Sequence, residues 1–291
     1  MSSYQPLILT TGATGRLARL ALAELVGRGA RVRALIRDPS QEAAVRAGGA
    51  TEVCIGDLTN RQSMEAALTG VDRLFYIPPA FMAEEAAVGR ALVDAAHGRG
   101  VTRIVLSSAI HPTLTHLVNH HAKAVVEEHI IGTGIEYTFL QPALVFQNYG
   151  AAFAAAARTG LFAEPYSNHS KICRVDYRDV AEVAGVALCE DRLTYGAFEL
   201  CADGQLDRME VAALMTRALG RQIEARAITY DEWLVRSGMP ADSLAAIGLK
   251  RMFAWYDSHG LHGNVTTLRA LLGREPRTLS AYFQELRGGL R

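Results

Sequence analysis

The sequence predicts an α/β fold built on a doubly wound parallel sheet, followed by a smaller C-terminal α/β lobe. Short apolar segments alternate with segments of helical periodicity up to about residue 190. The apolar segments have hydrophobic residues at consecutive positions, as strands that are buried on both faces do. A glycine-rich turn joins the first apolar segment to the first helix. Together these features are typical of a Rossmann-type sheet.

The glycine-rich turn lies between a predicted strand at residues 7–11 and a predicted helix at residues 16–28. Its pattern is Gly-x-x-Gly-x-x-Ala, formed by Gly12, Gly15 and Ala18. A helix that opens from such a turn offers backbone N–H groups to a pyrophosphate at the positive end of its dipole. The two glycines let the backbone approach the phosphate, and the alanine lets the helix pack on the sheet. We therefore expect a dinucleotide site, with a tight turn that binds no ligand as the alternative.

The rest of the core continues the alternation. Strands are predicted at residues 31–36, 52–55, 71–77, 103–108 and 137–140, and helices from near residue 59, at 83–99 and at 119–131. Thr59 and Gln62 have the spacing of a capping box at the start of one of these helices.

Beyond residue 150 the pattern is less regular. We expect a helix that starts near Asp179, strands at 198–200 and 223–228, and helices at 207–220, at 230–236 and near the C-terminus. The predicted domains are a dinucleotide-binding core at residues 1–150 and a mainly substrate-binding lobe at residues 151–291, with segments that return to the core.

Composition restricts the partners of the protein. Lys plus Arg and Asp plus Glu both number 30 among 291 residues, and no basic stripe is present, which argues against nucleic acid and anionic membranes. No apolar run approaches the ~18 residues of a membrane span, and the N-terminus lacks signal-peptide features. The four cysteines lie singly, as reduced core residues do. We expect a cytoplasmic monomer or homodimer that acts on a small molecule.

The end of the second strand bears on which dinucleotide binds. In sites that prefer NAD(H), an acidic residue there accepts hydrogen bonds from the adenosine ribose. Here Ile36 holds that position and Arg37 follows it. An arginine can bind a 2′-phosphate, and Arg16 could add a second positive charge, so NADP(H) is favoured over NAD(H). The alternative is that Arg37 is a solvated strand end. Asp57 could reach the adenine edge while Leu58 packs on the adenine face.

Several motifs together resemble those of a known family. They lie at residues 11–15, 37–39, 56–58, 123–127, 134–140, 175–181 and 272–277. The chain resembles the NmrA-like family of atypical short-chain dehydrogenases, near triphenylmethane reductase and the isoflavone-reductase-like enzymes. The resemblance implies the fold and the cofactor more specifically than the reaction, since the family contains reductases of quinones, dyes and phenylpropanoids alongside NADPH-sensing regulators.

Further cofactor contacts are expected around the same site. They are Thr14, Leu17, Ile77, Pro78 and Ser107 and, by the resemblance, Pro142, Ala143 and Leu144.

Lys123 is the candidate catalytic residue. Mainstream short-chain dehydrogenases have a tyrosine four residues before the catalytic lysine, whereas this chain has Asn119 there. Lys123 aligns instead with the lysine that isoflavone-reductase-like enzymes use, fourteen residues before Tyr137. The resemblance implies that Lys123 binds the nicotinamide ribose and places positive charge near a developing oxyanion. A solvated helix lysine is the alternative.

Histidines crowd residues 111–129. His116 and His120 have i, i+4 spacing, but no third ligand lies at a matching spacing, so no metal site is expected. His111 or His120 is a candidate proton donor or polar anchor in the substrate pocket, and exposed helix histidines are the alternative.

Aromatic residues suggest a pocket for a flat substrate. By the resemblance, Phe146, Asn148 and Tyr149 begin the pocket wall. Trp255 and Tyr256 could close it as part of a lid helix. Aromatic side chains suit an aromatic ligand, although core packing explains them equally well.

The sequence thus predicts an NADP(H)-dependent oxidoreductase that transfers hydride to a small aromatic or conjugated acceptor, such as a quinone, an enone or a dye. Conjugation stabilises the negative charge that follows hydride addition, so no strong acid is required. The missing tyrosine leaves open a second function, a non-catalytic NADP(H)-binding redox sensor.

Overall fold

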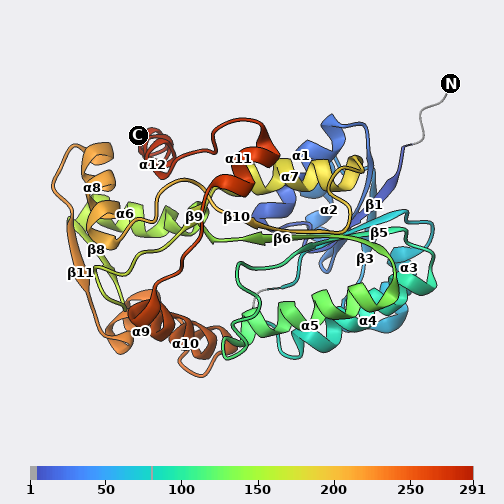
Figure 1. The fold of residues 1–291 in the computed structure, drawn as a ribbon, viewed down its shortest axis with the longest axis horizontal. Coiled ribbons are helices and arrows are strands. Elements are labelled where there is room, and N and C mark those ends of the chain that lie inside the picture. Colours follow the sequence, from blue (N-terminus) through green and yellow to red (C-terminus); the bar gives the residue numbers. More distant parts are fainter. Residues whose placement is uncertain (1–4, 80, 291) are drawn as a thin grey trace. The chain divides into compact units, whose positions relative to one another are not determined.

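The computed structural model describes residues 5–79 and 81–290, so Met1 and Arg291, the outer ends of the two predicted domains, lie outside the described residues (Figure 1). The chain forms two compact units. Unit 1 comprises the described residues of Met1–Gln141 and Val180–Phe198, and unit 2 comprises those of Pro142–Asp179 and Glu199–Arg291. The chain therefore passes through unit 2, returns to unit 1, and then completes unit 2.

Unit 1 is built on a seven-stranded sheet in the order β10–β6–β5–β4–β1–β2–β3. The strands are β1 (Leu7–Thr10), β2 (Arg31–Ile36), β3 (Glu52–Ile55), β4 (Arg73–Tyr76), β5 (Arg103–Ser107), β6 (Glu136–Pro142) and β10 (Gly196–Leu200). Every neighbouring pair from β6 to β3 is parallel. This arrangement confirms the predicted Rossmann-type parallel sheet.

Helices cover both faces of this sheet (Figure 1). One face carries α3 (Arg61–Leu68), α4 (Glu85–Gly98) and α5 (Val118–Thr133), and the other carries α1 (Arg16–Gly27) and most of α7 (Tyr177–Cys189). Because side chains alternate along a strand, Leu7 and Leu9 pack against α3 to α5, while the fully buried Ile8 faces the opposite layer. A short 3₁₀ turn (Pro39–Gln41) and α2 (Glu42–Ala47) connect β2 to β3.

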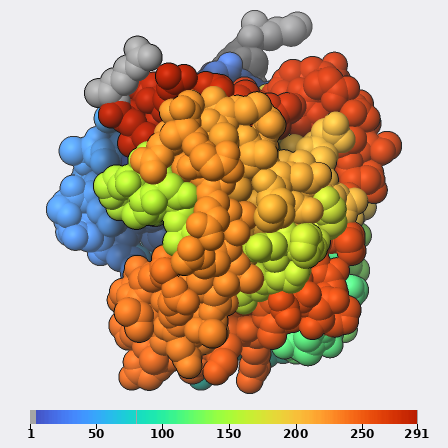
Figure 2. Space-filling view, turned by 90° about the vertical axis from the view of Figure 1, so that its left-hand side faces the viewer, coloured from blue at the N-terminus to red at the C-terminus, as the bar shows by residue number. Residues whose placement is uncertain are grey.

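Unit 2 contains two small parallel sheets. One pairs β8 (Leu161–Glu164) with β11 (Glu224–Ala227), and the other pairs β7 (Leu144–Val145) with β9 (Arg174–Val175). In Figure 2 the orange segment around β11 lies beside yellow-green segments of the chain, in keeping with the pairing of β8 and β11.

The helices of unit 2 enclose a separate core. They are α6 (Tyr149–Thr159), α8 (Arg208–Leu219), α9 (Tyr230–Ser237), α10 (Leu244–His259), α11 (Thr266–Leu272) and α12 (Leu279–Gly288). Phe153 of α6, Met215 of α8 and Phe283 of α12 meet in this core and are buried. Among the described residues, no helix has the length and apolar character needed to cross a membrane.

Two predicted helix starts are wrong. Asn60 caps α3 by accepting the Ser63 N–H at 3.0 Å, because Thr59 is engaged by the Asp57 carboxylate and does not cap the helix as predicted. Helix α7 begins at Tyr177, two residues before the predicted start at Asp179, because Asp176 accepts the Arg178 N–H at 2.8 Å.

Candidate functional site

A cavity of about 570 Å³ lies where the order of the strands reverses. Strand β1 lies between β2 and β4. From β1 the chain runs outward on one side through β2 to β3, and then outward on the other side through β4 and β5 to β6. Ligands of open α/β sheets bind beyond the carboxyl ends of the strands at such a point. The lining residues are Gly12, Ala13, Thr14, Gly15, Leu35, Ile36, Arg37, Gln41, Gly56, Asp57, Leu58, Thr59, Ile77, Pro78, Pro79 and Met82.

The turn after β1 requires glycine at two positions. Gly12 has a φ of +59°, which L side chains rarely adopt. The Gly15 N–H donates to the Gly12 carbonyl at 2.8 Å, and a Cβ on Gly15 would lie 3.0 Å from that carbonyl oxygen. The Thr11 hydroxyl accepts the Ile77 N–H at 2.8 Å and donates to the Ile77 carbonyl at 3.1 Å. The turn is therefore tight, has no side chain at Gly12 or Gly15, and is fixed to the end of β4.

The N-terminus of α1 suits an anion. Among the described residues, no side chain caps this helix, and its first turn contains no acidic residue. The positive end of the helix dipole is therefore not neutralised by a carboxylate. A tight glycine turn and an open helix N-terminus fit the pyrophosphate of a dinucleotide.

Arg37 and Asp57 line the same cavity. The Asp57 carboxylate accepts the Thr59 N–H and hydroxyl, both at 2.8 Å. These two hydrogen bonds and, more weakly, the charge of Arg37 hold the pKa of Asp57 below its usual range, so this carboxyl is ionised at neutral pH. Arg37 is exposed at the end of β2, where a 2′-phosphate could accept from its guanidinium.

The cavity brings together most of the cofactor residues predicted from the sequence. They are Gly12, Thr14, Gly15, Arg37, Asp57, Leu58, Ile77 and Pro78. Leu17 is buried in the core, and Arg16 lies exposed at the start of α1. Other lining residues were not predicted as cofactor contacts, although most of them adjoin residues that were: Ala13, Leu35, Ile36, Gln41, Gly56, Thr59, Pro79 and Met82.

Four of the remaining predicted cofactor residues lie at or next to strand ends, and the fifth, Lys123, lies in α5. Ser107 is the last residue of β5 and is buried. Pro142 ends β6, and Ala143 donates its N–H to the Leu200 carbonyl at 3.1 Å. Leu144 begins β7 and lines a second cavity, within unit 2.

Lys123 is buried rather than solvated. Its ammonium group donates to the Glu85 carboxylate, and the two side chains are 10% and 5% exposed. The pair joins α5 to α4. The contact with Glu85 holds the Lys123 ammonium group in one position. Because the Glu85 carboxylate offsets part of its charge, Lys123 stabilises an oxyanion less than an unpaired lysine would.

His120 precedes Lys123 by three residues in α5 and is 3% exposed. Its Nδ1 lies 3.1 Å from the His111 carbonyl oxygen, and burial lowers the pKa of His120, so the ring is neutral at neutral pH and donates to that carbonyl. His116 lies before the first residue of α5, outside the helical spacing assumed in the sequence analysis. The described residues contain no group of three His, Cys, Asp or Glu side chains placed to hold a metal.

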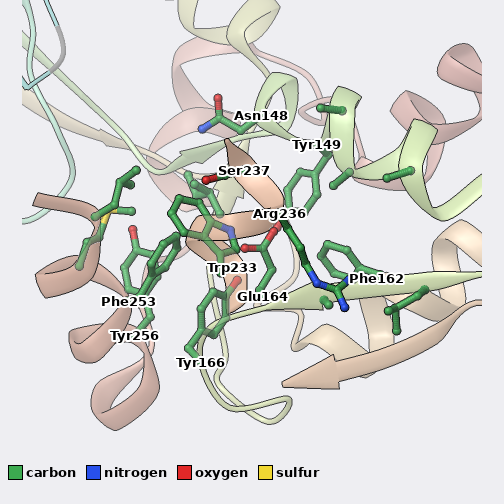
Figure 3. A pocket seen from close by; sticks show the side chains of 18 of the residues that line it. Asn148, Tyr149, Phe162, Glu164, Tyr166, Trp233, Arg236, Ser237, Phe253 and Tyr256 are labelled. Carbon is green, nitrogen blue, oxygen red and sulfur yellow. The ribbon is translucent and has the colours of Figure 1, made fainter. Parts of the chain in front are cut away.

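A second cavity, of about 550 Å³, is lined wholly by unit 2 residues (Figure 3). Its aromatic lining residues are Tyr149, Phe162, Tyr166, Trp233, Phe253 and Tyr256, and its polar ones include Asn148, Glu164, Arg236 and Ser237. Asn148 and Tyr149 therefore lie where the sequence analysis expected a pocket wall. Glu164 and Trp233 were missed, because neither belongs to a recognisable motif.

Two other predicted pocket residues lie elsewhere. Phe146 is buried in the core of unit 2. Trp255 stacks on His259, with ring centroids 3.9 Å apart, and does not line the cavity. Phe253 and Tyr256 of α10 do line it, because residues three apart share a helix face and Trp255 points in another direction.

The parallel sheet, the glycine turn at its switch point and the arginine after β2 define a dinucleotide-binding protein of the dehydrogenase type. Residues 5–283 match the NmrA-like family, and the chain belongs to this family. The family resemblance seen in the sequence motifs is thereby confirmed.

Named relatives are similar over nearly the whole chain. NAD(P)H azoreductase from Xenophilus azovorans is 28% identical over 285 residues, which cover 95% of this chain and 96% of the relative. The structure of NADPH-dependent quinone oxidoreductase from Escherichia coli in complex with NADPH is 26% identical, with a TM-score of 0.86, and the match covers 96% of this chain and 99% of that one. Triphenylmethane reductase from Citrobacter sp., complexed with NADP(H), shares the fold with a TM-score of 0.85 at 21% identity over 96% of this chain and 99% of that one.

Proposed function

We propose that this protein is an NADP(H)-dependent oxidoreductase that transfers hydride to small aromatic or conjugated acceptors such as quinones, enones and dyes. The observation that carries the proposal is the glycine-lined cavity at the switch point of the sheet, with Arg37 in its lining. The azoreductase and the quinone oxidoreductase support it, since both are similar over nearly the full chain.

The residues of unit 1 fit the dinucleotide. The turn at Gly12 and Gly15 and the N-terminus of α1 bind the pyrophosphate, and Arg37 binds the 2′-phosphate. Lys123, fixed by Glu85, donates to the nicotinamide ribose. NADPH, when bound, supplies the hydride.

The aromatic cavity of unit 2 supports the choice of acceptor. Tyr166, Trp233 and Phe253 offer flat apolar surfaces to a conjugated ring system. Such an acceptor delocalises the charge that hydride addition creates, so its reduction does not depend on the tyrosine that Asn119 replaces.

A redox sensor that binds NADP(H) without turnover is the second candidate. Asn119 at the usual tyrosine position and the partly neutralised charge of Lys123 favour it. Turnover separates the two candidates.

The test measures cofactor binding and NADPH oxidation in one preparation. We expect NADPH to bind more tightly than NADH, and a panel of quinones, enones and azo dyes to include compounds that oxidise bound NADPH. Gly15→Val is the control, because its side chain would fill the turn and abolish binding in a folded protein. Tight NADPH binding without oxidation by any compound would establish the sensor, and unchanged NADPH affinity in folded Gly15→Val would refute the site.

Two further predictions from the sequence stay open. Cell fractionation would check the cytoplasmic location, and sedimentation would distinguish a monomer from a homodimer.

A further inference from the structure

We propose that Glu164 is the proton donor for acceptors bound in the aromatic cavity of unit 2. We further propose that these acceptors are neutral planar aromatics that carry a hydrogen-bond-accepting oxygen or nitrogen. The proton-transfer part rests on the proposed function, whereas the ligand class follows from the cavity alone.

The cavity has rigid aromatic walls. Tyr166 stacks on Phe253 with ring centroids 5.9 Å apart, and Tyr256 meets the Tyr166 ring edge-on at 5.8 Å. Trp233 contacts Phe253 edge-on at 4.9 Å. Because these rings hold one another in place, the walls suit a flat ligand that stacks between or beside them.

Glu164 places a carboxyl group among these rings. It is the last residue of β8, and its backbone carbonyl accepts from Arg208 Nη1 at 3.0 Å and from the Ile228 N–H at 3.2 Å. The Trp233 indole N–H donates to its carboxylate, and Figure 3 shows the two groups facing each other. The backbone of Glu164 is therefore fixed, and its carboxyl lies at the wall of the cavity.

The surroundings of Glu164 bring the pKa of its carboxyl group close to neutral pH. Burial raises the pKa of Glu164 to about 7, and Arg208, Trp233 and Arg174 oppose the rise only partly. The charged and titratable groups on the packed elements are Tyr149 of α6, Tyr166 after β8, Arg174 of β9, Arg208 of α8, Arg236 of α9 and Tyr256 of α10. Burial raises the pKa of each of these tyrosines, so they are neutral at neutral pH. An acid whose pKa lies near the working pH is well suited to donate a proton.

Positive charge around the cavity favours a neutral acceptor over an organic cation. Arg174 and Arg208 are almost fully buried beside the cavity wall, and Arg236 lines it. A cation would meet the Arg236 guanidinium in the lining, with Arg174 and Arg208 in contact with the wall residues Tyr149 and Tyr166, and would find Glu164 half protonated. An acceptor oxygen or nitrogen that gains negative charge meets a favourable field instead.

When hydride reaches the acceptor, an electron pair moves onto the acceptor oxygen or nitrogen. That atom forms a bond to the Glu164 proton as the carboxyl O–H bond breaks, and the resulting carboxylate accepts from Trp233 and is stabilised by Arg208. Water then returns a proton to Glu164.

The first experiment measures ligand binding without NADPH. The chain has two tryptophans, so in a Trp255→Phe background the fluorescence of Trp233 reports occupancy of the cavity. The probes are 1,4-naphthoquinone and N-methylquinolinium, which are similar in size and differ in charge. Glu224→Gln, an exposed carboxylate on the paired strand β11, is the matched control.

We expect naphthoquinone to bind more tightly below pH 7 than above it, because only the protonated carboxyl donates to the quinone oxygen. N-methylquinolinium should bind at least about tenfold more weakly, the effect of ~1.4 kcal/mol. Glu164→Gln should remove the pH dependence, and Glu224→Gln should retain it. Tighter binding of the cation, or an unchanged pH dependence in Glu164→Gln, would overturn the ligand class.

The second experiment measures NADPH oxidation by naphthoquinone. Glu164→Gln should lower kcat by about 10²–10⁴-fold, with little change in KM, and abolish the fall in kcat above pH 7. Glu164→Asp should restore part of kcat together with the pH dependence, and circular dichroism checks that each variant folds. A Glu164→Gln variant with the wild-type kcat and pH profile would refute the proton donor. If the wild type oxidises no NADPH, the proton step fails with the proposed function, while the binding experiment still decides the ligand class.

Discussion

We propose that Arg37 makes the main contribution to the choice between the two dinucleotides. Its guanidinium lies at the end of β2, on the cavity that also contains the glycine turn. A charge-assisted contact with a 2′-phosphate contributes about 1.5–3 kcal/mol. Arg37→Ala should therefore weaken NADPH binding by about ten- to hundredfold and leave NADH binding nearly unchanged, as measured by calorimetry.

Arg46→Ala is the matched control, since Arg46 is exposed on α2 and pairs with Glu42. Equal losses for NADPH and NADH in Arg37→Ala, or a native preference for NADH, would show that Arg37 does not read the 2′-phosphate.

At the residue scale, the sequence predicts a functional position when neighbouring residues define its conformation. Gly12 and Arg37 belong to a strand–turn–helix unit whose geometry follows from local spacing. Glu164 and Trp233 are 69 residues apart in the chain, and only the folding of unit 2 brings them together. No local pattern therefore indicates that they meet.

The ion pair between Glu85 of α4 and Lys123 of α5 combines a structural role with the proposed catalytic one. Removing one partner of a buried pair costs about 3–5 kcal/mol, because the other charge stays buried. Lys123→Met should lower the free energy of unfolding by a similar amount and reduce kcat/KM by about one to three decades.

The double variant Glu85→Gln/Lys123→Met separates the two roles. It should recover much of the stability, measured by urea denaturation, because no unpaired charge remains. It should not recover turnover if Lys123 contacts the ribose. Recovery of kcat/KM along with stability would mean that Lys123 acts only through packing.

The first turn of α7 contains a second buried charge cluster. Asp179 is fully buried and accepts the Arg277 N–H at 2.8 Å and Arg274 Nη2 at 2.9 Å, and it also pairs with the Arg277 guanidinium. This cluster ties the segment between α11 and α12 to α7. Asp179→Ala should lower the free energy of unfolding by about 1.5–3 kcal/mol, since the Arg277 N–H and two partly exposed arginines lose their shared acceptor.

Asp191→Ala provides the comparison, because Asp191 also pairs with an arginine but its side chain is 86% exposed. The free energy of unfolding of Asp191→Ala, measured in urea, should be close to that of the wild type. Equal effects of the two substitutions would contradict the importance assigned to the buried cluster.

At the element scale, the sequence predicts the strands of unit 1 and its helices other than α2, because most of them have a clear hydrophobic pattern and end near Gly, Pro or Asp. The helix α6 and the strand β8 were not predicted. Residues 151–157 are mostly alanine, so they show little amphipathic contrast, and β8 is a four-residue segment that ends in an acidic residue. Tertiary packing determines the structure of such segments.

At the scale of the whole molecule, the two cavities that we propose for the cofactor and for the acceptor belong to different units. The glycine-lined cavity belongs to unit 1, and the aromatic cavity belongs to unit 2. The first boundary between the units falls between Gln141 and Pro142, before the last residue of the core strand β6. The sequence predicts segments that return to the core, but it gives no local signal within β6 for the point at which the chain first leaves unit 1.

The central claim is that bound NADPH gives a hydride to a conjugated acceptor. An anaerobic single-turnover experiment tests it most directly: protein loaded with one equivalent of NADPH is mixed with excess 1,4-naphthoquinone, and the absorbances of NADPH and quinol are followed together. We predict that one equivalent of quinol forms for each NADPH consumed, at a rate that exceeds the reaction without protein and is lost in Gly15→Val. Bound NADPH that persists unoxidised, in contact with each acceptor of the panel, would contradict the claim.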